Sequence, residues 1–175
     1  IVRAERVVEI SASDLVMRPP STSKRAATIV LNAGPTLAAN AQALATWNEA
    51  AALWESMLGD NVVITIDADL APLPPGVLGS TGSSTWQAPY DDIRNAVVAD
   101  RAPDEAIVAG LPTGAQLTLD FPSTPAGFAY DGRLRATRAT LSAVGFNMEG
   151  PDPGGSDATI TFSTGFLPNF DFDPT

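Results

Sequence analysis

The order strand, helix, strand between residues 27 and 70 constrains the fold of this chain more than any other feature. In the segment ATIVLNA, Ile29 and Leu31 recur with the period of two that is typical of a strand. Residues 40–58 then place apolar side chains three and four positions apart, which predicts an amphipathic helix. The segment NVVITIDADL is again a strand by its alternation. Two strands joined by one helix predict a parallel, right-handed βαβ unit.

The remaining segments extend this unit into a larger α/β domain. Residues 71–88 are rich in Pro, Gly and Ser, so we expect a long loop there. Further elements are expected as helices over 89–100, 103–110 and 133–146, and as strands over 117–121 and 157–164. The predicted fold class is α/β (α+β): a twisted mixed sheet with a βαβ start, a backing helix and an edge strand. Residues 1–25 are interpreted as an N-terminal arm or linker, and 26–175 as a single domain.

The apolar stripes of these strands and of the first helix each need a partner, so we expect them to meet in one core. The two tryptophans of the helix are interpreted as core residues, because large aromatic side chains on an amphipathic helix usually pack against a sheet. The predicted core contains Leu44, Trp47, Trp54, Leu58, Ile64, Ile66, Ile160 and Phe162.

Composition excludes several classes of function. Ten Lys and Arg face twenty Asp and Glu, and a formal net charge of -10 makes nucleic-acid binding unfavourable. The chain has no histidine and no cysteine, which removes Ser-His-Asp and Cys-His catalysis and zinc sites built on imidazole. No apolar run reaches the roughly 20 residues of a membrane span. A single lysine, 15 prolines and many Ser, Thr and Gly residues favour a secreted, extracellular protein.

Two groups of acidic residues are candidates for chemistry. Asp67 and Asp69 lie two apart on the polar side of a predicted strand, so both carboxylates point the same way, although a solvated face near a strand end is the simpler reading. Asn169, Asp171 and Asp173 recur at every second position, which is the spacing of oxygen ligands in a calcium loop. The alternative interpretation is a solvated acidic tail. Calcium is therefore the only cofactor for which this chain offers candidate ligands.

Several segments together resemble the N-terminal subdomain of secreted bacterial zincin-type metalloproteases, in particular the exported group that carries a sorting tail. The resemblance covers roughly residues 26–175 and depends on the order of ATIVLNAG, ALATWNEAAALWESML, NVVITIDADL, VLGST and SDATITFSTGFLPNFDFDPT. It implies a twisted sheet with a backing helix, followed by a separate half whose His-Glu-x-x-His helix binds zinc. Since this chain has no histidine, no catalytic or zinc-binding residue is assigned in it.

The resemblance also implies that the last strand borders a substrate cleft and pairs with an extended peptide. The predicted substrate or partner edge strand consists of Asp157, Ala158, Thr159, Ile160, Thr161, Phe162, Ser163 and Thr164. Its free edge would be covered by a missing C-terminal catalytic half, by the arm around Val7 to Ile10, or by another copy of the chain. The expected function is the non-catalytic scaffold and substrate-edge portion of a secreted zinc metalloprotease. The alternative is an extracellular structural or adhesive subunit that assembles by β-strand addition.

Overall fold

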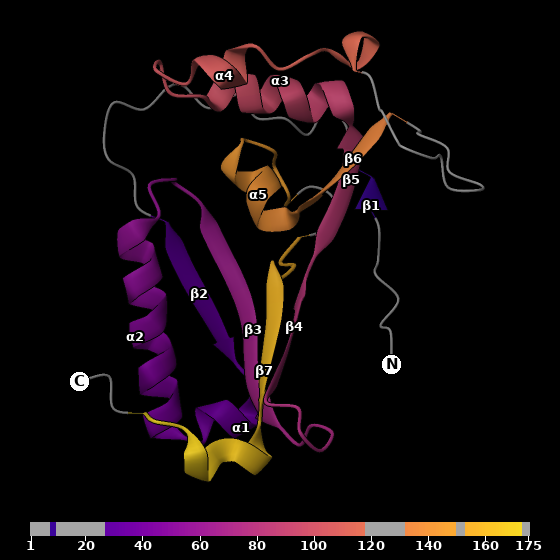
Figure 1. The fold of residues 1–175 in the computed structure, drawn as a ribbon. Helices are drawn as coiled ribbons and strands as arrows, with labels where there is room; N and C mark the ends of the chain where they lie inside the picture. The colour runs from indigo at the N-terminus through magenta and orange to yellow at the C-terminus, as the bar shows by residue number, and fades with distance from the viewer. Residues whose placement is uncertain (1–7, 10–26, 118–131, 150–152, 173–175) are drawn as a thin grey trace, which may run out of the picture. The chain divides into compact units, whose positions relative to one another are not determined.

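The computed structural model describes residues 8–9, 27–117, 132–149 and 153–172 (Figure 1). The chain divides into two compact units: unit 1 comprises residues 1–20 and 85–153, and unit 2 comprises residues 21–84 and 154–175. Each unit has its own sheet and its own buried apolar cluster. That residues 26–175 act as a single domain stays a prediction, because compactness alone does not tell whether two units fold independently.

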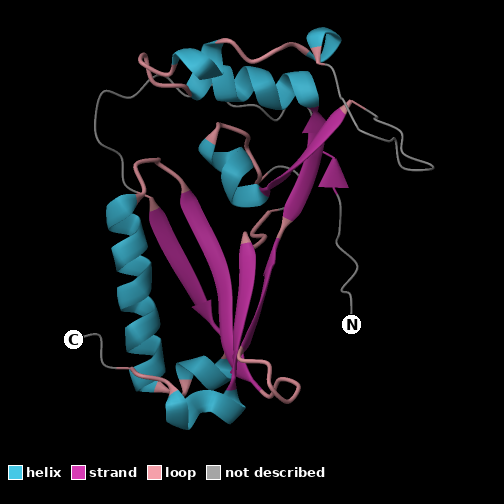
Figure 2. Cartoon of the chain, in the orientation of Figure 1, coloured by secondary structure: helices cyan, strands magenta, loops and turns pink. Residues whose placement is uncertain are grey.

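Unit 2 is built on a four-stranded mixed sheet with the strand order β2-β3-β7-β4. Its strands are β2 (Thr28–Ala33), β3 (Val63–Ala71), β4 (Gly79–Ser83) and β7 (Ala158–Ser163). The pairs β2/β3 and β3/β7 are parallel, whereas β4 runs antiparallel to β7. The sheet and the helices drawn in Figure 2 confirm the predicted α/β fold class.

The βαβ start of unit 2 is confirmed, with one addition. Helix α2 (Ala41–Met57) connects β2 to β3, and the Asn40 side chain accepts a hydrogen bond from the Ala43 N–H at its first turn. Between β2 and α2 the structure adds a short helix, α1 (Pro35–Ala38), for which no element was predicted. Proline at the first position suits a helix start, because its missing N–H would have no partner there.

Strand β7 is not an edge strand, so the prediction for Asp157 to Thr164 is wrong in this respect. It pairs with β3 on one side and with β4 on the other. Strand β4 has no local signal in the sequence: GSTGS has no apolar alternation and lies in the Pro, Gly and Ser-rich segment that predicts a loop. Tertiary pairing with β7 makes this segment a strand, and β4 becomes the edge.

Asp157 fixes the position of β7 between its two neighbours. The side chain, with only 2% of its surface exposed, accepts a hydrogen bond from the Thr65 N–H at 2.7 Å. Its backbone N–H donates to the Thr65 carbonyl at 2.7 Å, and its carbonyl accepts from the Ser84 N–H at 2.8 Å. Asp157, directly before the first residue of β7, therefore bonds to Thr65 on one side and to Ser84 on the other.

The core of unit 2 differs from the predicted one. Leu37, Ala43, Ala68 and Leu70 are buried, and Leu44, Trp47 and Phe162 pack against them as expected. The prediction that Trp54 belongs to the core is wrong, since 58% of its surface is exposed. Leu58, Ile64, Ile66 and Ile160 are only half-buried.

The exposure of Trp54 has a local cause in the way α2 meets the sheet. Glu55 of α2 accepts a hydrogen bond from the Ile29 N–H at 2.5 Å, and this amide belongs to the outer edge of β2. The last turns of α2 therefore face the edge of β2 through Glu55. Leu53, Trp54 and Met57 are left exposed on another side of the helix.

Unit 1 contains a three-stranded sheet with the order β1-β5-β6. Its strands are β1 (Val8–Glu9), β5 (Thr85–Pro89) and β6 (Arg133–Thr137). Its helices are α3 (Tyr90–Asp100), α4 (Ala106–Ala109), the 3-10 helix η2 (Gly114–Gln116) and α5 (Arg138–Ala143). Its buried cluster contains Trp86, Ala88, Ile93, Ala96, Leu141, Phe146 and Met148.

Three predictions for this part of the chain need correction, and a fourth lies mostly outside the described residues. Residues 133–146 do not form one helix: β6 pairs with β5, and Thr137 then caps α5 by accepting from the Thr140 N–H. The helix expected over 103–110 is present only as the shorter helix α4. Most of the strand expected over 117–121 lies outside the described residues. The arm was offered as a partner for β7, but its described part, β1, pairs in parallel with Trp86 and Gln87 of β5.

We expect Asp157→Ala to lower the free energy of unfolding by about 1–3 kcal/mol, because a part-buried amide loses its acceptor. Urea denaturation followed by circular dichroism measures this. Asp67→Ala is the control: Asp67 is exposed, and the change should stay below about 0.5 kcal/mol. Equal effects of the two substitutions would contradict the role given to Asp157.

Candidate functional site

The outer edge of β4 is the first candidate site. All five residues from Gly79 to Ser83 are exposed, and none is charged. Within the described part of the chain, the sheet ends at this strand. The strand itself has neither the lysine nor the proline that often protects a sheet edge, and no further strand of the described ranges pairs with its outer side.

The hydrogen-bond pattern shows which backbone groups of β4 point away from the sheet. The Ser163 N–H donates to the Leu78 carbonyl, and the Ser84 N–H donates to the Asp157 carbonyl. In an antiparallel pair such bonded positions alternate with positions that face outward. Ser80 and Gly82 therefore face β7, while Gly79, Thr81 and Ser83 direct their N–H and C=O groups outward.

Glycine at position 79 leaves room for the Phe162 side chain. Gly79 lies opposite Phe162, and a Cβ atom at residue 79 would stand 2.8 Å from the Phe162 ring. Real Cβ atoms do not approach other atoms so closely, and the glycine lets β4 lie directly over the ring. In the sequence alone, Gly79 belongs to the Pro, Gly and Ser-rich segment that predicts a loop.

The carboxylates of Asp67 and Asp69 have different hydrogen-bond partners and different exposure. Asp67 is exposed, and its Oδ1 accepts from the Asn32 side-chain amide at 2.9 Å. The Oδ1 of Asp69 accepts from the backbone N–H groups of Leu37 at 2.9 Å and of Leu70 at 2.8 Å. Asp69 thus supplies the side-chain cap that α1 lacks in its own N-cap residue, Gly34. This capping role assigns Asp69 to structure rather than to acid-base chemistry.

The calcium candidates are only partly within the described residues. Asn169 ends the 3-10 helix η3 (Thr164–Asn169), and Asp171 follows as an exposed residue. Asp173 lies outside the described residues. Across the described ranges, no group of three or more His, Cys, Asp or Glu side chains is placed to hold a metal ion. The calcium site stays a prediction.

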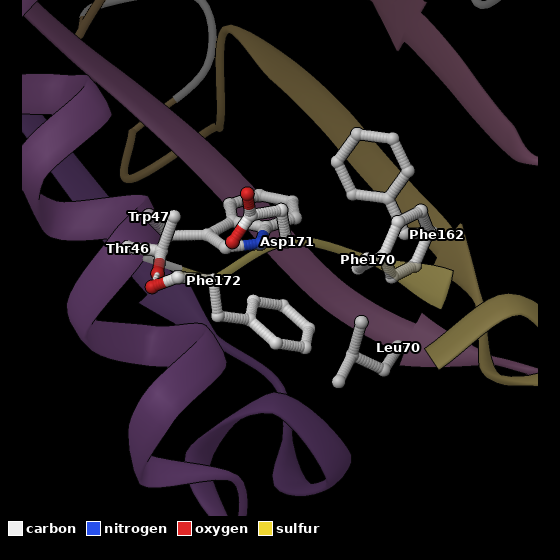
Figure 3. Close-up of a pocket in the computed structure, with 7 residues that line it drawn as sticks. All are labelled: Thr46, Trp47, Leu70, Phe162, Phe170, Asp171 and Phe172. Atoms are coloured by element: carbon white, nitrogen blue, oxygen red, sulfur yellow. Dashed lines mark hydrogen bonds between the residues drawn. The ribbon is translucent and has the colours of Figure 1, made fainter. Parts of the chain in front are cut away.

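A small aromatic pocket is lined by residues of α2, of β3 and β7, and of the segment that follows η3 (Figure 3). We define this aromatic pocket by four rings, those of Trp47, Phe162, Phe170 and Phe172. Leu70, Thr46 and Asp171 complete its lining, and its volume is about 150 Å³. The Thr46 hydroxyl donates to the Phe172 carbonyl at 3.0 Å, which ties the segment to the helix. The spacing of Phe162, Phe170 and Phe172 in the sequence gave no hint of this pocket, because it requires the chain to turn back through η3.

Comparison with known proteins yields no match: no protein-family model, no curated protein and no solved structure is similar to this chain. The resemblance to zincin-type metalloproteases therefore stays a prediction. As for membranes, none of the helices in the described ranges has the length and apolarity needed to cross a bilayer.

We expect Gly34→Ala to lower the free energy of unfolding by about 1–3 kcal/mol. A Cβ atom at residue 34 would overlap the Asp69 carboxyl group and displace it from the Leu37 N–H. Thermal and urea denaturation measure the effect. Gly59→Ala is the matched control, since nothing lies within 4 Å of a Cβ atom there, and its effect should stay within about 0.5 kcal/mol. A neutral Gly34→Ala would contradict the capping role of Asp69.

Proposed function

We propose that this chain is the non-catalytic scaffold and substrate-edge portion of a secreted zinc metalloprotease. The observation that carries the proposal is the open, uncharged edge of β4, which suits the addition of an extended peptide strand. Backbone groups of Gly79, Thr81 and Ser83 supply the donors and acceptors. The substrate edge is thus assigned to β4, in place of the β7 strand that the sequence favoured.

A second surface of unit 2 suits the docking of a catalytic half. Leu53, Trp54 and Met57 have 57%, 58% and 62% of their surfaces exposed on the last turns of α2. Large apolar side chains gathered on one helix side favour a protein partner over water.

Zinc would be bound by the catalytic half. With no histidine or cysteine in the sequence, this chain lacks the nitrogen and sulfur ligands of such sites. The contribution of unit 2 is to orient the peptide as an added strand and to hold the catalytic half. Orientation of this kind lowers the barrier of a reaction because the reactants need not find their geometry by chance.

The alternative function uses the same edge for a different partner. An uncharged β4 without protecting residues would also accept the edge strand of a second copy, as an extracellular structural or adhesive subunit does when it assembles. The two functions differ in what the edge binds and in whether peptide hydrolysis accompanies binding.

The purified 175-residue chain, with or without added zinc, is expected not to hydrolyse peptide bonds. Expression together with the coding sequence that follows it in its natural reading frame is expected to give hydrolysis that zinc restores after chelation. Peptide cleavage with a fluorogenic library measures both. A natural reading frame that encodes no zinc-binding half would overturn the protease proposal and leave the assembling subunit.

Thr81→Pro tests the role of the β4 edge directly, since proline removes an outward N–H and leaves the pairing with β7 intact. In the hydrolytic protein we expect the KM for extended peptides to rise about tenfold with little change in kcat. Ser80→Pro is the matched control: Ser80 faces Thr161 of β7, so the change should lower the unfolding stability instead.

If the chain is an assembling subunit, Thr81→Pro should instead abolish its self-association in sedimentation velocity experiments. A Thr81→Pro variant that changes neither KM nor self-association would contradict both uses of this edge.

A further inference from the structure

The four rings of the aromatic pocket form the walls of one space (Figure 3). Trp47 and Phe162 have ring centroids 5.4 Å apart with an interplanar angle of 80°. Phe162 and Phe170 follow at 5.6 Å and 63°, and Phe170 and Phe172 at 5.9 Å and 70°. Because each ring meets the next edge to face rather than stacked, the rings turn their faces in different directions, as the walls of a box do.

The pocket is not simply a packing gap in the core of unit 2. Its lining includes an acidic side chain, Asp171, together with the Thr46 hydroxyl. A carboxylate at a pocket otherwise lined by aromatic rings gains no electrostatic attraction from a neutral apolar ligand. Beside a cation the same carboxylate is favourable, and the aromatic faces attract positive charge through their quadrupoles.

We infer that the aromatic pocket binds an organic cation with an alkylated ammonium head. Its volume of about 150 Å³ accommodates a group the size of a benzene ring, and a trimethylammonium head is of this size. Charge complementarity also operates over a longer range, because the formal net charge of -10 attracts cations to the chain. The lining comes from α2, from Leu70 of β3, from Phe162 of β7 and from the segment after β7. It does not include the outward backbone groups of Gly79, Thr81 and Ser83 on which the proposed function rests.

Choline and its neutral isostere 3,3-dimethyl-1-butanol are the probes, and the readout is the indole N–H resonance of Trp47 in the full chain. The two compounds have the same shape and differ in the charged nitrogen. We expect choline to shift this resonance saturably and to bind about tenfold more tightly than the isostere. Trp54 and Trp86, which do not line the pocket, should not respond.

Two substitutions separate charge from shape. Asp171→Asn should weaken choline binding about three- to fivefold, because Asp171 is exposed and its charge is partly screened, and should leave binding of the isostere unchanged. Trp47→Leu should abolish choline binding. Trp54→Leu is its matched control on the same helix and should have no effect.

Circular dichroism establishes that each of these variants is folded, and Asp171→Asn serves as the decisive test if Trp47→Leu is unstable. Equal affinity for choline and the isostere, or no saturable shift of Trp47, would overturn the inference. Thr81→Pro should leave choline binding intact, so failure of this site and failure of the β4 edge are distinguishable.

Discussion

The sheet of unit 2 depends on a single buried carboxylate. Asp157 holds the Thr65 amide with its side chain, the Thr65 carbonyl with its own amide, and the Ser84 amide with its carbonyl. A buried carboxylate is costly unless hydrogen bonds compensate it, so the register of three segments is selected together. A slip of β7 by one residue would expose the apolar side chains of this strand and leave the carboxylate without its donor. The edge of β4 and the ring of Phe162 both take their positions from this register.

Elements with local signals were predictable from the sequence. Asn40 marks the start of α2, and the alternation around Ile29 and Ile64 marks two strands, because these features act within a few residues. The same reasoning failed for β4. The segment GSTGS has weak intrinsic preference for a strand, and its pairing partner lies about 80 residues later in the chain. β6 is a similar case, since RLRAT reads as part of a helix until its pairing with β5 is known.

The candidate sites show the same division between local and distant information. That Asp67 and Asp69 share one side of a strand follows from the period of two, but the use of Asp69 as a cap for α1 depends on the close passage of Gly34. The aromatic pocket joins Trp47 to Phe170 and Phe172, which are far apart in the sequence and meet only because η3 reverses the chain. The prediction that Trp54 is a core residue was wrong. An amphipathic pattern shows which residues share one side of a helix, but it does not show that the end of α2 meets the edge of β2 through Glu55.

The way in which the chain leaves and re-enters unit 2 has an evolutionary consequence. The Ser84 hydroxyl donates to the Ser156 carbonyl at 2.7 Å, beside the bond between the Ser84 amide and the Asp157 carbonyl. Residues 84 and 156, which flank the segment 85–155, are therefore joined by hydrogen bonds within unit 2. We call this pair of bonds the neck of the segment. Lengthening or exchanging such a stretch costs only the slowly growing entropy of loop closure. The sheet and its open edge can persist while the sequence from 85 to 153 diversifies, which makes this neck a natural point for recombination between related genes.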